Sequence, residues 1–168
     1  MGFESFRVEL RGGQDTYSKV NETILQHLHV KFDEQSPPLT GAAFYVVDDG
    51  RHVIEVEIKD APVRISCRFT LCHPTSVDSV FLELVRELML RLEMEVWICD
   101  DVQPEDAHSF ALADYAEFSS AALRSIGARR AEWITAFGAE QMPATTNEVH
   151  ERIILPRCRP VAAWTENK

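Results

Sequence analysis

The sequence lacks the short motifs that mark the commonest cofactor and catalytic sites. It contains no GxGxxG or GxxxxGK[ST] phosphate loop, no GxSxG turn, no HExxH, and no HxE with PCxxC. Dinucleotide-binding, P-loop, serine-hydrolase, zincin and zinc-deaminase functions therefore lose their main support. We assign no catalytic residue and expect no cofactor and no metal, and we leave open whether the protein is an enzyme.

A long hydrophobic run is also missing. No apolar stretch approaches the roughly 20 residues that cross a bilayer, and the first ten residues alternate polar and apolar, unlike a secretory signal. The cysteines form no CxxC pair, and we expect them to be reduced thiols. They are Cys67, Cys72, Cys99 and Cys158. These features predict a cytoplasmic protein that does not bind membranes.

Positive charge is scarce, with 17 Lys and Arg against 27 Asp and Glu and a formal net charge of −10. The imbalance lies in residues 1–123, which carry −12, whereas residues 124–168 carry +2. A strongly acidic body repels nucleic acid and anionic membranes at long range. We therefore expect no nucleic-acid partner.

A chain of 168 residues predicts one globular domain over 1–168, with a loose tail after residue 160. Alternating polarity predicts strands, and apolar residues three or four apart predict helices. The expected strands cover 3–11, 42–47, 52–58, 63–71 and 94–99, with a further candidate at 152–155. The expected helices cover 16–30, 75–92 and 110–137.

Asp49-Gly50 predicts a two-residue hairpin turn, because the mirror-image turns that fit hairpins need positive φ. This turn would place Val47 opposite His52 and Tyr45 opposite Ile54. The whole order, β-α-β-β-β-α-β-α, indicates an α+β two-layer sandwich. We expect a mostly antiparallel sheet with helices on one face, as a variant of the ferredoxin-like arrangement.

If helices cover one face of this sheet, the period of two assigns the side chains of the opposite face. Three interpretations of that face remain open. It is a solvated face with Glu–Arg pairs across strands, an interface of apolar groups ringed by charge, or the seat of the last helix. A second copy docking there would give a homo-oligomer. The predicted residues are Arg7, Glu9, Arg11, Phe44, Val46, Val53, Glu55, Glu57, Arg64, Arg68, Glu95 and Trp97.

The stretch 93–106 holds six acids, no Lys or Arg, and Trp97. Dense negative charge speeds encounter with a basic partner, and aromatic side chains anchor interfaces. Other interpretations are that the acids complement a helix dipole, or that they bind Mg²⁺ or Ca²⁺, although their spacing matches no EF-hand loop. The predicted partner-binding residues are Glu95, Trp97, Asp100, Asp101, Glu105 and Asp106.

We therefore hypothesise an acidic protein-interaction module that binds and occludes a basic protein, for example an immunity or inhibitor protein that neutralises a toxin. The alternative is a small-ligand-binding protein or enzyme with a pocket between the sheet and the last helix. That pocket would use Tyr115, Trp133, His108 and Cys99. The adjacent pair Cys72-His73 makes a poor catalytic dyad, because neighbours on a strand point to opposite faces.

Overall fold

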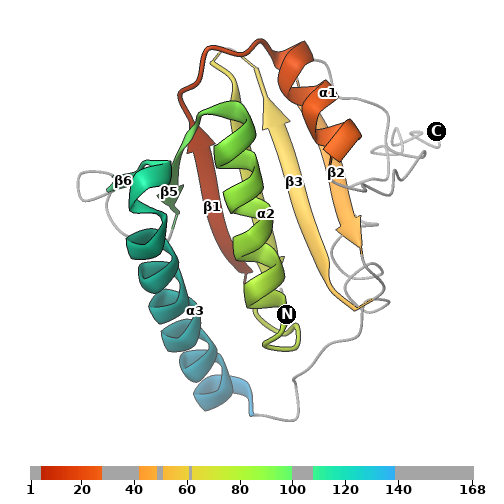
Figure 1. The fold of residues 1–168 in the computed structure, drawn as a ribbon. Coiled ribbons are helices and arrows are strands. Elements are labelled where there is room, and N and C mark those ends of the chain that lie inside the picture. The colour runs from red at the N-terminus through yellow and green to blue at the C-terminus, as the bar shows by residue number, and fades with distance from the viewer. Residues whose placement is uncertain (1–4, 28–41, 49–50, 61, 100–107, 139–168) are drawn as a thin grey trace, which may run out of the picture.

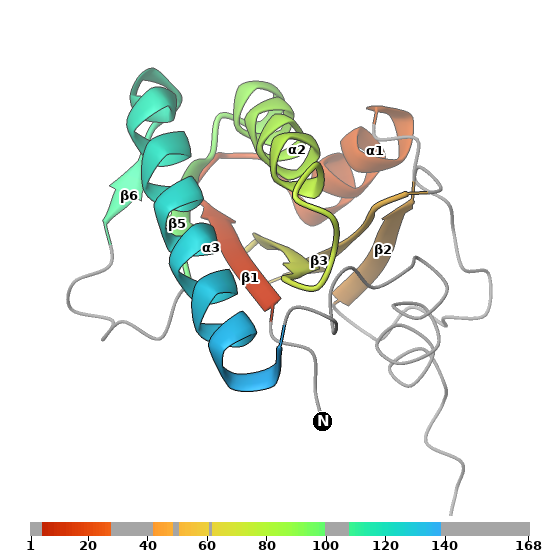
Figure 2. The same cartoon turned by 90° about the horizontal axis from the view of Figure 1, so that it is seen from below.

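The computed structural model describes residues 5–27, 42–48, 51–60, 62–99 and 108–138. Within them, helices lie on one face of a six-stranded sheet (Figures 1 and 2). The elements are β1 Ser5–Arg11, α1 Tyr17–His27, β2 Ala42–Asp48, β3 Val53–Lys59, β4 Arg64–Thr70, α2 Val77–Leu92, β5 Glu95–Ile98, β6 Ser109–Phe110 and α3 Tyr115–Phe137. A 3-10 turn over Leu112–Asp114 precedes α3. The predicted strand at 152–155 and the tail after 160 lie outside these residues.

The predicted α+β class is confirmed, since each neighbouring pair of strands is antiparallel and the described helices share one face. The strand order is β2-β3-β4-β1-β5-β6, so the ferredoxin-like order is not confirmed. Strand β6 includes Phe110, where we expected the last helix to begin, and it pairs with Val96 and Trp97 of β5. The helix begins at Tyr115 instead. No helix among the described residues has the length and hydrophobicity that crossing a bilayer requires.

The register of the β2–β3 hairpin differs from the prediction. Val47 lies opposite Ile54 and Tyr45 opposite Val56, so residues 49–52 separate the two strands instead of Asp49-Gly50 alone. Side chains alternate with a period of two, and a shift of two residues therefore leaves every side chain on its predicted face. The Tyr45 hydroxyl accordingly donates to the side-chain oxygen of Asn21 on α1.

The core between sheet and helices is centred on three aromatic rings, Phe6 of β1, Phe69 of β4 and Phe81 of α2. Each is at most 1% exposed, and the ring centroids lie 4.9 to 6.0 Å apart in tilted or edge-on contacts. Burying one such side chain contributes about 1.5–3 kcal/mol. The rings therefore fix α2 over the centre of the sheet. The opposite sheet face has no described helix.

Helix α3 is anchored beside α2 by a buried ion pair. Arg130 donates from Nη1 and Nη2 to the two carboxylate oxygens of Asp78, at 2.6 and 2.7 Å, and from Nε to the backbone carbonyl of Leu71 at 3.3 Å. Near the other end of α3, the Tyr115 hydroxyl donates to the carbonyl of Leu82 on α2. These contacts place the last helix on the same side of the sheet as the other two. The interpretation that it packs on the opposite sheet face is therefore wrong.

Candidate interaction surface on the open sheet face

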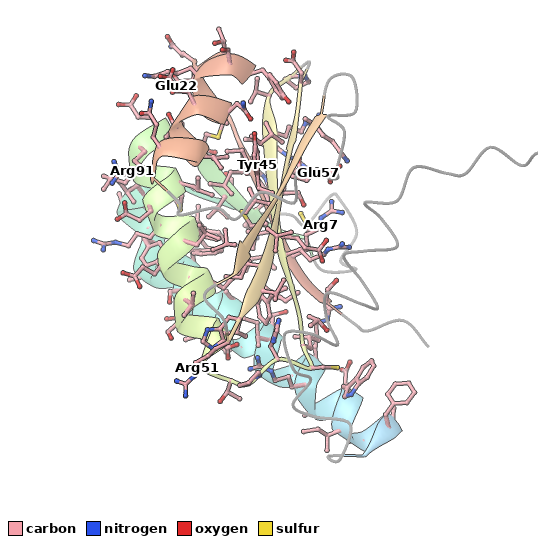
Figure 3. The ribbon with its side chains drawn as sticks, turned by 90° about the vertical axis from the view of Figure 1, so that its right-hand side faces the viewer. Arg7, Glu22, Tyr45, Arg51, Glu57 and Arg91 are labelled. Atoms are coloured by element: carbon pink, nitrogen blue, oxygen red, sulfur yellow. The ribbon has the colours of Figure 1, made fainter. Side chains whose placement is uncertain are left out.

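The sheet face without a described helix, here called the open face, carries charged side chains of both signs. In Figure 3, Arg7 and Glu57 lie on the side of the sheet away from the helices, whereas Tyr45 lies toward α1. Strand pairing arranges the residues in rows across the sheet. The rows contain Glu55, Arg68 and Arg7; then Glu57, Ser66, Glu9 and Trp97; then Lys59 with Arg64, and Arg11 with Glu95.

Glu9 occupies the centre of this face and contacts three arginines. Arg11 Nε lies 2.6 Å from Glu9 Oε1, Arg64 Nη1 lies 3.5 Å from the same oxygen, and Arg7 Nη2 lies 3.6 Å from Oε2. The Glu9 side chain is only 10% exposed, whereas those of the arginines are 41 to 49% exposed. We call Arg7, Arg11 and Arg64 the arginine cluster, in which three positive charges share one carboxylate.

Trp97, a predicted partner-binding residue, is half-buried on β5 directly opposite Glu9. The guanidinium carbon of Arg11 lies 5.1 Å from the centroid of the indole, which is a cation–π contact. Glu95, also predicted, is exposed and faces Arg11. Acids surround Trp97 along the chain, but in space its neighbours on β1 include an arginine.

The other four predicted residues, Asp100, Asp101, Glu105 and Asp106, lie outside the described residues. The side chain of Phe44, which we expected on the open face, also lies outside the part that the structure describes. The Arg11–Trp97 contact joins segments far apart in the sequence. Strand alternation put both residues on the open face, but no local signal indicated that β1 is the neighbour of β5.

Next to the arginine cluster, Arg68 forms an ion pair with Glu55 across the strands, as one of the three interpretations of this face predicted. Burial raises the pKa of the Glu55 carboxyl, although Arg68 acts in the opposite direction. Burial likewise raises the pKa of the Cys99 thiol, while a hydrogen bond from Arg7 partly opposes the rise. Cys99 is therefore a protonated thiol at neutral pH and a weak nucleophile.

A second polar cluster, not predicted from the sequence, joins the start of β3 to the start of α2. His52 Nε2 lies 2.7 Å from Ser76 Oγ, and His73 Nε2 accepts the backbone N–H of Val53 at 3.1 Å. Both histidines are buried. His73 thus bonds to the hairpin backbone, and it lies with Cys72 in the turn after β4.

The residues of the alternative pocket are not brought together. Tyr115 and Trp133 lie on one helix, 18 residues apart, which corresponds to about 27 Å. Trp133 packs on Phe137, with ring centroids 4.5 Å apart. His108 is exposed before β6, and Cys99 interacts with Arg7. Among the described residues, no three His, Cys, Asp or Glu side chains gather where they could hold a metal ion.

Comparison of the chain with protein-family models, with curated proteins and with solved structures finds no match. Inference about function therefore depends on the residues of the open face.

Proposed function

We propose that the protein is a cytoplasmic, acidic protein-interaction module that binds a basic protein at the β5 side of its open face. An immunity or inhibitor protein that occludes a toxin is the concrete form of this proposal. The observation that supports it is the half-buried Trp97, which lies on a sheet face without a described helix and just precedes the acidic segment 100–106.

The acids of the open face differ in how much of their charge is available to a partner. Glu9 and Glu55 are buried and paired with arginines of the same sheet. Glu95 is exposed, and the four acids at 100, 101, 105 and 106 follow β5 in the sequence. A basic partner would therefore bind Glu95 and the acids that follow β5 in the sequence, with the Trp97 indole as its apolar anchor.

A photo-crosslinking amino acid at two exposed positions tests the location of the interface. We expect a basic protein to crosslink from position 95 on the open face and not from position 90, where Leu90 is exposed on α2. Mass spectrometry would identify the captured protein. Equal capture at both positions would contradict binding at the open face.

Affinity measurements with the purified partner test the roles of the residues. Trp97→Ala should weaken binding by about 2 kcal/mol or more, roughly 30-fold, because truncating a central aromatic anchor carries such a loss. Changing Asp100, Asp101 and Asp106 to Asn and Glu105 to Gln should slow association, most clearly at low salt. Glu83→Gln, an exposed acid on α2, is the matched control. Unchanged affinity in the Trp97 variant would refute the proposal.

A further inference from the structure

Within the part of the chain that the structure describes, the arginine cluster has more positive charge than its carboxylate contacts neutralise. Arg7 lies directly opposite Arg68 across β1 and β4, an arrangement of like charges that destabilises a sheet. Arg68 is compensated by Glu55, but Arg7 shares Glu9 with Arg11 and Arg64. The central strands therefore hold an excess of guanidinium groups beside the Trp97 indole.

The contacts within the cluster also leave hydrogen-bond donors over. Each guanidinium carries five N–H donors in a planar fork. Arg11 makes a short bond to Glu9, but the 3.6 Å and 3.5 Å separations of Arg7 and Arg64 from Glu9 exceed the usual hydrogen-bond range of about 2.7–3.2 Å. Nearly half of the surface of these two side chains is exposed. Arg7 also bonds to the Cys99 thiol. With five donors on each guanidinium, both side chains still keep N–H groups for pairing with another carboxylate.

We propose that the arginine cluster is a binding site for an acidic polypeptide segment. Arg7 and Arg64 bind carboxylates of that segment, and Trp97, with Arg11 held against its ring, provides the adjacent apolar contact. This site shares Trp97 with the site proposed for the basic partner, but its charged residues are the arginines and not the acids at 95 and 100–106. The arginine contacts can therefore be tested without the basic partner.

The surroundings of the cluster favour a polypeptide over a nucleic acid. Glu55 and Glu57 border it on β3, and Glu95 borders it on β5. A nucleic acid carries charge on every backbone unit, so it would bring phosphates close to these acids. A polypeptide can place single carboxylates at the arginines and neutral residues beside the glutamates. The net charge of −10 disfavours a polyanion further.

Calorimetric titration of the full chain with a defined peptide tests this proposal. The probe is a short capped peptide in which glutamate alternates with serine, and its counterpart carries glutamine in place of glutamate. We expect the glutamate peptide to bind about tenfold more tightly than the glutamine peptide, because charged bidentate pairs are the stronger ones. The preference should decrease as salt is added.

Arginine variants connect that binding to the site. The double variant Arg7→Gln and Arg64→Gln should bind the glutamate peptide about tenfold more weakly, and Arg124→Gln, an exposed arginine on α3, should bind as wild type does. Arg64→Lys keeps the charge and loses the planar fork, so it should weaken binding several-fold even if the double variant does not fold.

Three results would overturn the proposal. The first is equal affinity of the wild type for the two peptides, and the second is unchanged binding in Arg64→Lys. The third is tighter binding of a single-stranded oligonucleotide than of the glutamate peptide. None of these measurements uses the basic partner or the acids at 100–106. A result that refutes the acidic-peptide site would therefore leave the proposed function untested by it and unchanged.

Discussion

Arginine occurs in two contrasting environments in this fold. Arg130 has a side chain only 9% exposed, and its fork bonds to both oxygens of Asp78 and to one carbonyl. The arginine cluster on the open face has side chains 41 to 49% exposed and one carboxylate for three guanidinium groups. Among the described residues, the guanidinium of Arg130 has a full set of acceptors, whereas the three guanidinium groups of the cluster have only Glu9 as an ion-pair partner.

The difference follows from the cost of burying charge. A buried guanidinium without a partner costs several kcal/mol, so a fold that contains one must supply nearly all of its bonds. A half-exposed guanidinium has water as an alternative partner and tolerates incomplete pairing. Incomplete pairing, more than positive charge itself, therefore distinguishes the arginines that are available for binding.

The largest effect is expected from breaking the buried pair. Asp78→Ala leaves Arg130 charged and buried without its counter-ion, so the free energy of unfolding should fall by about 3–5 kcal/mol. Urea denaturation measures this loss. Arg91→Gln breaks the exposed pair with Glu87 on α2 and should change stability by about 0.5 kcal/mol or less. Similar losses in the two variants would show that burial does not determine how much each ion pair contributes to stability.

An intermediate effect is expected at the centre of the arginine cluster. Glu9→Gln removes the one carboxylate that three guanidinium groups share, so stability should fall by about 1–3 kcal/mol. The arginines are partly exposed, and salt should therefore reduce the loss. Urea denaturation at about 0.05 M and about 0.5 M salt compares the two conditions. A loss that is independent of salt would indicate that repulsion between the arginines is not its cause.

The sequence predicted which side chains share a face much better than which strands are neighbours. Alternation put Glu55 and Arg68 on one face, and the structure pairs them. Alternation also put Trp97 and Glu95 on that face. It did not predict that they lie next to Arg11, because the pairing of β1 with β5 depends on the packing of the whole sheet. Periodicity of two carries no information about a neighbour some 90 residues away.

The same limit applies to the hairpin and to the last helix. Asp49-Gly50 predicted a hairpin of the two flanking strands, which is confirmed, but in the wrong register. Turn propensity alone fixes neither the loop length nor the strand pairing. Arg130 of the last helix pairs with Asp78 of another helix, 52 residues away, a contact that only the packing of α3 against α2 creates.

The smallest effect is expected at the ion pair of Glu55 and Arg68, whose arginine is less exposed than the arginine cluster and more exposed than Arg130. Burial raises the pKa of Glu55 above its ordinary value of 4.5, so ionising this carboxyl costs more in the folded state than in the unfolded chain. Its contribution to the free energy of unfolding is therefore greatest in acid and declines as pH rises from 4.5 through the folded pKa.

Glu55→Gln removes this titration while keeping the shape of the side chain. We expect the stability of the wild type relative to Glu55→Gln to fall as pH rises through that window, and urea denaturation over a pH series measures the difference. Glu83→Gln, at an exposed position, is the control for general effects of charge. If the wild type instead gained stability relative to Glu55→Gln, attraction by Arg68 would outweigh desolvation. Glu55 would then belong with Asp78 among carboxylates that the fold fully compensates.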